Sequence, residues 1–159
     1  MGITNRFRAF LSMDIQKKLL LLEAFFYLGW ARILLMVPFS KVAPSLGVQM
    51  LETSTAVDTA NRTVLLSVHE AINIMSNHTF WESKCLVKAI AGMKMLNKRR
   101  MDSTLYLGTA KDEHGKMIAH AWLRSGSYYI TGAEGREKFT VVGKFGRQIV
   151  NRDKGGNYE

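Results

Sequence analysis

The sequence predicts an α+β fold, with helices in the first hundred residues and an antiparallel sheet after them. Two observations lead to this prediction. Apolar residues recur at helical spacing up to about residue 98, and short β-prone runs separated by turn residues follow from residue 104. We expect a single domain over residues 1–150, helical to residue 100 and sheet from 101, and a disordered tail over 151–159.

The composition limits the classes of function. The chain has 159 residues, a formal charge of +9 and one cysteine, Cys85. A single cysteine excludes an internal disulfide framework and a cysteine-cluster metal site, and it suits a reducing, cytoplasmic location. The histidines lack metal-binding spacing, and we expect no cofactor. The basic balance suits an acidic peptide, a nucleic acid or an anionic membrane. No basic block is longer than residues 97–100, and these lie at a helix end, where cations are favoured in any case, which argues against nucleic acid.

The first helix is predicted over residues 14–37, and it is apolar on nearly every side. Charged residues interrupt it, so no uncharged run reaches the ~18 residues that a membrane span needs. We expect a core helix or one that packs on a partner, with membrane-surface association as a less favoured alternative. Residues 38–44 should be extended or turned, and 47–61 an irregular loop. The expected helical face comprises Leu19, Leu22, Phe26, Trp30 and Ile33.

Two further helices follow. The first begins near Asn61, and His69 next to its apolar face is expected to be an ordinary half-buried histidine. The second runs to about Lys98, with Ser83 as its predicted N-cap. This places Cys85 in the first helical turn, where unpaired N–H groups and the helix dipole favour a thiolate.

Strands are predicted in the last third of the chain, as a meander of antiparallel neighbours. Gly115 and Gly126 supply the turns between the first three of them. His120 lies on the second strand, so an imidazole and the Cys85 thiol could form a catalytic pair. The alternative is that Cys85 is a small buried hydrophobe. The predicted strands cover residues 104–109, 116–124, 128–131 and 139–145.

Several segments together resemble a known family. In order, they are residues 85–89, 95–100, 105–108 and 119–122, with further similarity at 30–32, 131–132 and 139–142. The chain resembles the B-type leader peptidases of lasso-peptide biosynthesis, which are transglutaminase-like cysteine proteases. The resemblance implies a papain-like arrangement, with Cys85 at the start of a central helix and His120 on the facing sheet. Because the chain begins directly with the helical part, it resembles the stand-alone form that lacks a leader-recognition domain.

The resemblance also implies a function and partners. The substrate would be a ribosomally made precursor peptide, delivered by a separate leader-recognition protein, and an ATP-dependent cyclase would close the ring on the freed amine. Where the family usually carries an aspartate after the histidine, this chain has Thr131 and Gly132. A threonine hydroxyl or a backbone carbonyl could hold the imidazole there, and Thr131 is our choice over Glu134 as the third catalytic residue.

Two other functions remain open at this point. The chain could be a non-catalytic peptide-binding adaptor in a peptide-maturation complex. It could also catalyse acyl transfer rather than hydrolysis, because both reactions use the same residues. Trp81 and Trp122 could shield the site or line a groove, although core packing explains them equally well.

Overall fold

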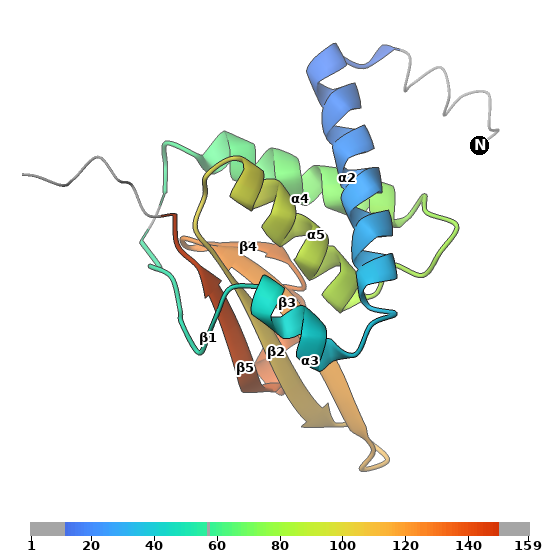
Figure 1. The fold of residues 1–159 in the computed structure, drawn as a ribbon, viewed down its shortest axis with the longest axis vertical. Coiled ribbons are helices and arrows are strands. Elements are labelled where there is room, and N and C mark those ends of the chain that lie inside the picture. Colours follow the sequence, from blue (N-terminus) through green and yellow to red (C-terminus); the bar gives the residue numbers. More distant parts are fainter. Residues whose placement is uncertain (1–11, 57, 150–159) are drawn as a thin grey trace, which may run out of the picture.

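The computed structural model describes residues 12–56 and 58–149, so the predicted tail at 151–159 lies outside the described residues. Three long helices lie together on one side of a five-stranded antiparallel sheet (Figure 1). This confirms the predicted α+β class. The helices are α2 (Ile15–Leu34), α4 (Arg62–Ser76) and α5 (Cys85–Lys98).

The sheet has the strand order β1-β5-β2-β3-β4. The predicted simple meander is therefore wrong, because β5 pairs with β2 and not with β4. This pairing places Phe145 of β5 opposite Leu105 of β2, and both residues are buried in the core. The five strands are β1 (Val48–Gln49), β2 (Ser103–Lys111), β3 (Met117–Ser125), β4 (Tyr128–Thr131) and β5 (Thr140–Arg147).

Helix α5 lies at the centre of the molecule and packs on β2, β3 and β4 as well as on both other helices. Most of its residues are buried, from Val87 to Leu96. Gly92 lets it approach the sheet closely, since a Cβ at this position would lie 2.8 Å from Leu123 Cδ2. The close packing fixes where the first residue of α5, Cys85, lies relative to β3 and β4.

Helix α2 buries a different face from the predicted one. Leu21, Ala24, Leu28 and Ala31 face the core, whereas the stripe that was expected to pack in the core or on a partner is exposed, with Phe26 at 71%. The helix is apolar on both faces, so periodicity alone could not choose between them. The small side chains of Ala24 and Ala31 allow a close approach to the neighbouring helices, and this favours the observed face.

An ion pair ties α2 to the end of α5. Arg99 Nη1 lies 2.6 Å and Lys98 Nζ 3.1 Å from the carboxylate of Glu23. Partial burial would raise the pKa of Glu23, but the hydrogen bonds from Arg99 and Lys98 outweigh it and lower the pKa. Asp14 caps the other end of α2 by accepting from the backbone N–H of Gln16 at 3.2 Å.

Two connecting segments also differ from the predictions. Residues 38–44 are mostly helical, in α3 (Phe39–Val42) and the 3₁₀ turn η1 (Ala43–Ser45), because proline is tolerated in the first turn of a helix. Residues 47–61 are not simply an irregular loop. They contain β1, which pairs with β5, and the buried Thr53, whose backbone N–H donates to Thr104 Oγ1 at 2.9 Å.

A charged network holds residues 52–54 against the sheet. The buried Arg124 guanidinium donates to the carbonyls of Thr53 and Ser54 and to the Tyr106 hydroxyl. Lys144 and Tyr106 donate to the carboxylate of Glu52, and these hydrogen bonds lower its pKa to about 2. Burial and the hydrogen bond to Glu52 raise the pKa of Tyr106 to about 12. These hydrogen bonds and ion pairs attach residues 52–54 to strands β2, β3 and β5.

Across residues 12–56 and 58–149, none of the helices combines the length and the apolar character that crossing a bilayer requires.

Candidate active site

Cys85 is the first residue of α5, and its side chain is half-buried. Lys84, in an extended conformation, is the N-cap, so the prediction of Ser83 is wrong. The Ser83 hydroxyl is instead 2.9 Å from Thr79 Oγ1, which holds the loop before the helix. Cys85 therefore belongs to the first turn of α5, whose backbone N–H groups have no acceptor within the helix. A negatively charged sulfur or oxygen is stabilised at this place.

His120 lies on β3, and two aromatic residues hold its ring. Trp122 lies 5.8 Å away between ring centroids, and Phe139 lies 5.0 Å away. His120 Nε2 is 3.0 Å from the carbonyl oxygen of Gly132. A carbonyl can only accept, so Nε2 carries the hydrogen and the neutral ring keeps its lone pair on Nδ1. Within the described part of the chain, Nδ1 has no hydrogen-bond partner, so it can accept a proton.

Cys85 and His120 line the same pocket, which has a volume of about 500 Å³. It lies between the start of α5, the middle of α4 and the segment that follows β4. Lys88 and Glu134 also line it, so its wall carries one charge of each sign. The structure thus brings the two residues of the predicted pair into one concave site large enough for a peptide side chain.

A second histidine, His69 of α4, lines the same pocket. Both of its ring nitrogens are engaged: Nδ1 lies 2.8 Å from the carbonyl oxygen of Ile130, and Nε2 lies 3.0 Å from Asn73 Nδ2. Nδ1 must donate to the carbonyl, so Nε2 accepts from the amide and the imidazole is neutral. His69 therefore lacks a free basic nitrogen, and of the two histidines His120 is the better general base.

Thr131 lines the pocket, but it does not contact His120 as predicted. Its Cα partner on β3 is Leu123, because the hairpin pairs Ser125 with Tyr128 and a register shift between Leu123 and Arg124 moves the alignment by one further residue. The Thr131 hydroxyl is buried and has no hydrogen-bond partner. The imidazole bonds instead to the backbone carbonyl of the next residue, Gly132. Glu134 lines the pocket with no hydrogen bond to His120 among the described residues.

Gly132 is the site residue whose role the sequence pattern left undecided. It adopts a φ of +67°, and a Cβ there would lie 2.4 Å from the carbonyl oxygen of Ala121. Only glycine fits this combination of backbone angle and space. The sequence offered one signal for this role: a glycine directly after a strand, at a position that the predicted hairpin places near His120. That signal locates a turn but does not show which way its carbonyl points.

Both candidate tryptophans pack against other aromatic side chains, and Trp81 is only partly buried. Trp122 is buried and stacks on Tyr106, with a centroid separation of 5.5 Å. Trp81 contacts Phe25 of α2, with centroids 5.1 Å apart, and does not line the pocket. Trp122 still contributes to the site, because its ring supports that of His120.

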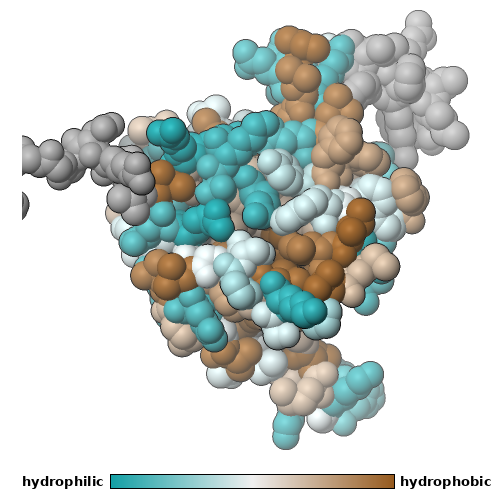
Figure 2. Space-filling model, in the orientation of Figure 1, coloured by the Kyte–Doolittle hydropathy of each residue, from teal (hydrophilic) through white to brown (hydrophobic). Residues whose placement is uncertain are grey.

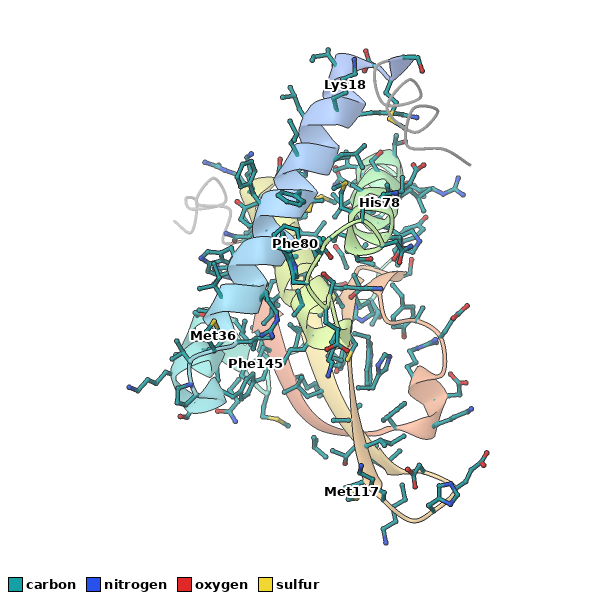
Figure 3. The ribbon with its side chains drawn as sticks, turned by 90° about the vertical axis from the view of Figure 1, so that its right-hand side faces the viewer. Lys18, Met36, His78, Phe80, Met117 and Phe145 are labelled. Carbon is teal, nitrogen blue, oxygen red and sulfur yellow. The ribbon has the colours of Figure 1, made fainter. Side chains whose placement is uncertain are left out.

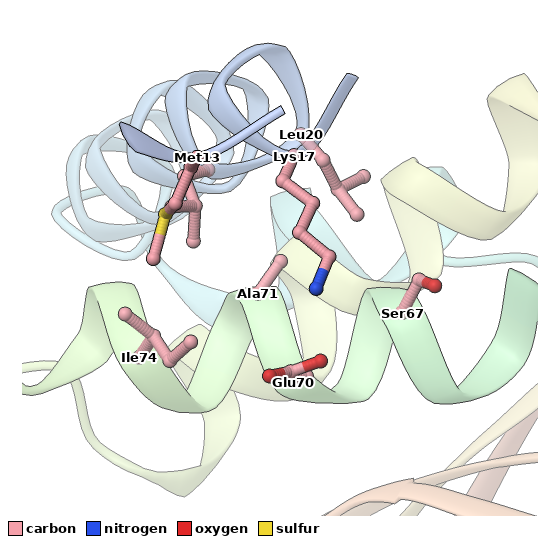
Figure 4. Close-up of a pocket in the computed structure, with 8 residues that line it drawn as sticks. Met13, Lys17, Leu20, Ser67, Glu70, Ala71 and Ile74 are labelled. Atoms are coloured by element: carbon pink, nitrogen blue, oxygen red, sulfur yellow. The ribbon is translucent and has the colours of Figure 1, made fainter. Parts of the chain in front are cut away.

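A smaller cavity of about 70 Å³ lies between α2 and α4 (Figure 4). Met13, Lys17 and Leu20 line it from the α2 side, and Glu70 and Ile74 from α4. It contains neither cysteine nor histidine, and it is too small for a peptide. We therefore place the candidate active site in the pocket of Cys85 and His120.

A comparison with family models matches the Transglutaminase-like superfamily over residues 33–144, which is more than half of the chain. The chain belongs to the transglutaminase-like superfamily. The matched region includes Cys85, His120 and Gly132, and a transglutaminase-like domain is consistent with a cysteine peptidase-type activity. Neither a curated protein nor a solved structure matches the chain.

Proposed function

We propose that this transglutaminase-like domain is a cysteine peptidase that removes the leader from a ribosomally made lasso-peptide precursor. One observation carries the proposal of peptidase chemistry. The Cys85 sulfur at a helix N-terminus and the His120 ring, with Nδ1 unoccupied, line one pocket. A thiol and an imidazole base in a shared pocket are the groups that cleave peptide bonds through a thioester.

The first half of the reaction forms the thioester. His120 Nδ1 accepts the proton of the Cys85 thiol, and the sulfur attacks the carbonyl carbon at the scissile bond. The resulting oxyanion is stabilised by backbone N–H groups of the first turn of α5, including that of Cys85. The C–N bond then breaks, His120 returns its proton to the leaving amine, and the leader remains bound to sulfur as a thioester.

The second half releases the leader. His120 Nδ1 accepts a proton from a water molecule, whose oxygen attacks the thioester carbonyl. The C–S bond breaks, the sulfur regains the proton and the leader leaves as a carboxylic acid. Throughout this sequence the carbonyl of Gly132 accepts from Nε2 and keeps the ring in the tautomer that leaves Nδ1 available.

A backbone carbonyl thus takes the orienting role that an aspartate has in many related sites. Lacking a full negative charge, the Gly132 carbonyl stabilises the imidazolium less than a carboxylate would. We infer that its main contribution is to fix the ring's orientation and tautomer. Thr131 then has no catalytic role in orienting His120, and its hydroxyl is buried without a hydrogen-bond partner.

The choice of substrate and partners depends on the family resemblance in the sequence. The precursor leader would enter the pocket of Cys85, with a separate recognition protein holding its other end, and an ATP-dependent cyclase would take the freed amine of the core peptide. Hydrolysis and acyl transfer both free the core amine when the thioester forms, so they differ only in the leader product, which gains one water in hydrolysis. In the alternative, a non-catalytic adaptor, the same pocket would bind the peptide without cleaving it.

The experiment combines the chain with a candidate lasso precursor, with and without a leader-recognition protein, and weighs the products. We expect leader and core fragments whose masses sum to that of the precursor plus one water. Cys85→Ala should abolish cleavage, and His114→Gln, in the exposed turn between β2 and β3, should not change it. Cleavage by Cys85→Ala at the wild-type rate would exclude the mechanism. Tight precursor binding without cleavage, by the wild-type chain with its recognition protein, would favour the adaptor.

A further inference from the structure

The outward face of α2 is a continuous stripe of large apolar side chains, on the side of the helix opposite its buried face. Ile15, Leu19, Leu22, Phe26, Trp30 and Ile33 form this stripe, and their exposed fractions range from 39% to 71%. A helix of 20 residues is about 30 Å long, so the stripe runs across much of the molecule. Figure 2 shows apolar side chains along α2 from its free upper end downward.

The stripe extends beyond α2 at two places. Met36, just after the helix, is 77% exposed, and Phe80, in the loop before α5, is 90% exposed. In Figure 3, Phe80 lies next to the middle of α2 and Met36 near its lower end. The rings of Phe25 and Trp81 connect the two regions, since Phe25 contacts Phe26 and Trp81 contacts Phe80. Exposed apolar surface of this extent marks a binding surface.

Basic side chains border the stripe on both edges. On the α5 edge, Lys94 Nζ lies 4.9 Å from the centroid of the Trp30 ring, and the Lys98 side chain is 60% exposed. Arg32 is exposed on the opposite edge, and Lys41 is exposed just beyond the helix. Two carboxylates beside this surface are already paired: Glu23 with Lys98 and Arg99, and Glu82, next to Trp81, with Lys84 at 3.4 Å. The surface around the stripe therefore carries a net positive charge.

We propose that this face docks on a membrane surface that contains anionic lipids. Apolar and aromatic residues along one helix face, with lysine and arginine at its edges, are the features of helices that lie in the headgroup region of a bilayer. Anionic headgroups would neutralise the bordering cations, and the long lysine and arginine side chains could reach them while the stripe enters the acyl boundary. The helix would lie on the membrane and would not cross it.

A second copy of the chain fits this surface less well. Pairing two identical stripes would bring Arg32, Lys94 and Lys98 of one copy toward the same basic residues of the other, in a chain whose formal charge is already +9. Like charges across an interface repel. An anionic bilayer matches both features of the surface, because its acyl chains can contact the apolar stripe while its headgroups contact the basic side chains.

Vesicle flotation tests the proposal with the full chain. We expect binding to vesicles of phosphatidylcholine mixed with phosphatidylglycerol, little binding to phosphatidylcholine alone, and release as salt is raised. Phe26→Gln should lower partitioning about tenfold or more, because the variant loses the free energy that a Phe side chain gains when it moves from water into the acyl region. Met117→Gln is the matched control, since Met117 is 59% exposed on β3, away from the stripe, and should leave binding unchanged.

Circular dichroism should show both variants folded, because both side chains are exposed. Failure of the wild type to bind the mixed vesicles would overturn the proposal, as would equal binding by Phe26→Gln. Sedimentation that shows a dimer abolished by Phe26→Gln, without vesicle binding, would assign the stripe to a second copy. Phe26 lies outside the pocket of Cys85, so the result is independent of whether the chain cleaves a precursor.

Discussion

His120 Nε2 lies 3.0 Å from the carbonyl oxygen of Gly132, so Nε2 carries the hydrogen of the neutral ring and Nδ1 keeps the lone pair. The acceptor belongs to the backbone, so no side chain can be deleted to remove it. Its position depends on the left-handed conformation of Gly132, at a φ of +67°. The geometry of a turn therefore sets the chemistry of the histidine.

Gly132→Ala is predicted to impair catalysis by moving this carbonyl. The new Cβ would lie 2.4 Å from Ala121 O, so the backbone must shift, and the residue would also keep an unfavourable φ. We expect a loss of about 1–3 kcal/mol in the free energy of unfolding and a fall in kcat of about tenfold or more. Chemical denaturation and a cleavage assay would measure the two effects.

Gly135→Ala is the matched control for that variant. Gly135 has a similar φ of +70°, but a Cβ there has no heavy atom within 4 Å. It should cost about 1 kcal/mol of stability and leave kcat near wild type. Equal activity losses in the two variants would show that the Gly132 carbonyl has no special role.

The two histidines of the pocket should respond differently to substitution. Of the two pocket histidines, His120 is the one with an unoccupied ring nitrogen, so kcat should fall by about 100-fold or more in His120→Gln. His69→Gln should lower stability, because the hydrogen bonds to Ile130 and Asn73 are lost, but should reduce kcat much less. Single-turnover cleavage and thermal melting separate these outcomes. A larger fall in kcat for His69→Gln would mean that the base is misassigned.

The charged network around Glu52 predicts an acid-sensitive stability. The pKa of Glu52 is lowered from 4.5 to about 2, so its contribution is fully present above about pH 4.5 and is lost as the pH falls toward 2. Glu52→Gln should lower stability at neutral pH and reduce the slope of unfolding free energy against pH in this window. Some slope remains, since the pKa of Glu23 is also lowered.

Denaturation at several pH values would measure that slope. Glu113→Gln, in the exposed turn between β2 and β3, is a control with the same change of charge and should leave the slope unchanged. A slope equal to wild type in Glu52→Gln would show that the network does not stabilise the fold.

Local pattern was sufficient to predict the secondary structure that carries the site. The position of Cys85 in the first turn of α5 and the strand around His120 follow from helical periodicity and from β-prone runs between turn residues, although the N-cap is one residue later than predicted. Both are short-range properties of the chain. The superfamily match covers both segments, the start of α5 and strand β3.

Features that depend on long-range contacts were predicted less well. Helix α2 is apolar all round, so only its packing on α4 and α5 could show that Phe26 faces outward. The pairing of β5 with β2 joins strands that are far apart in the sequence, and turn residues carry no information about it. The hairpin register and the one-residue shift next to Leu123 place Thr131 opposite Leu123 and not opposite His120, and the Gly132 carbonyl contacts the imidazole instead.

The most direct test of the Cys85–His120 pair needs no substrate. Cys85 is the only cysteine in the chain, so the rate of alkylation by iodoacetamide reports on it alone. At neutral pH we predict that the folded wild-type protein reacts at least about tenfold faster than His120→Gln, because the imidazole accepts the thiol proton. Equal rates in the two proteins, or labelling of the wild type only after unfolding, would contradict the proposed site.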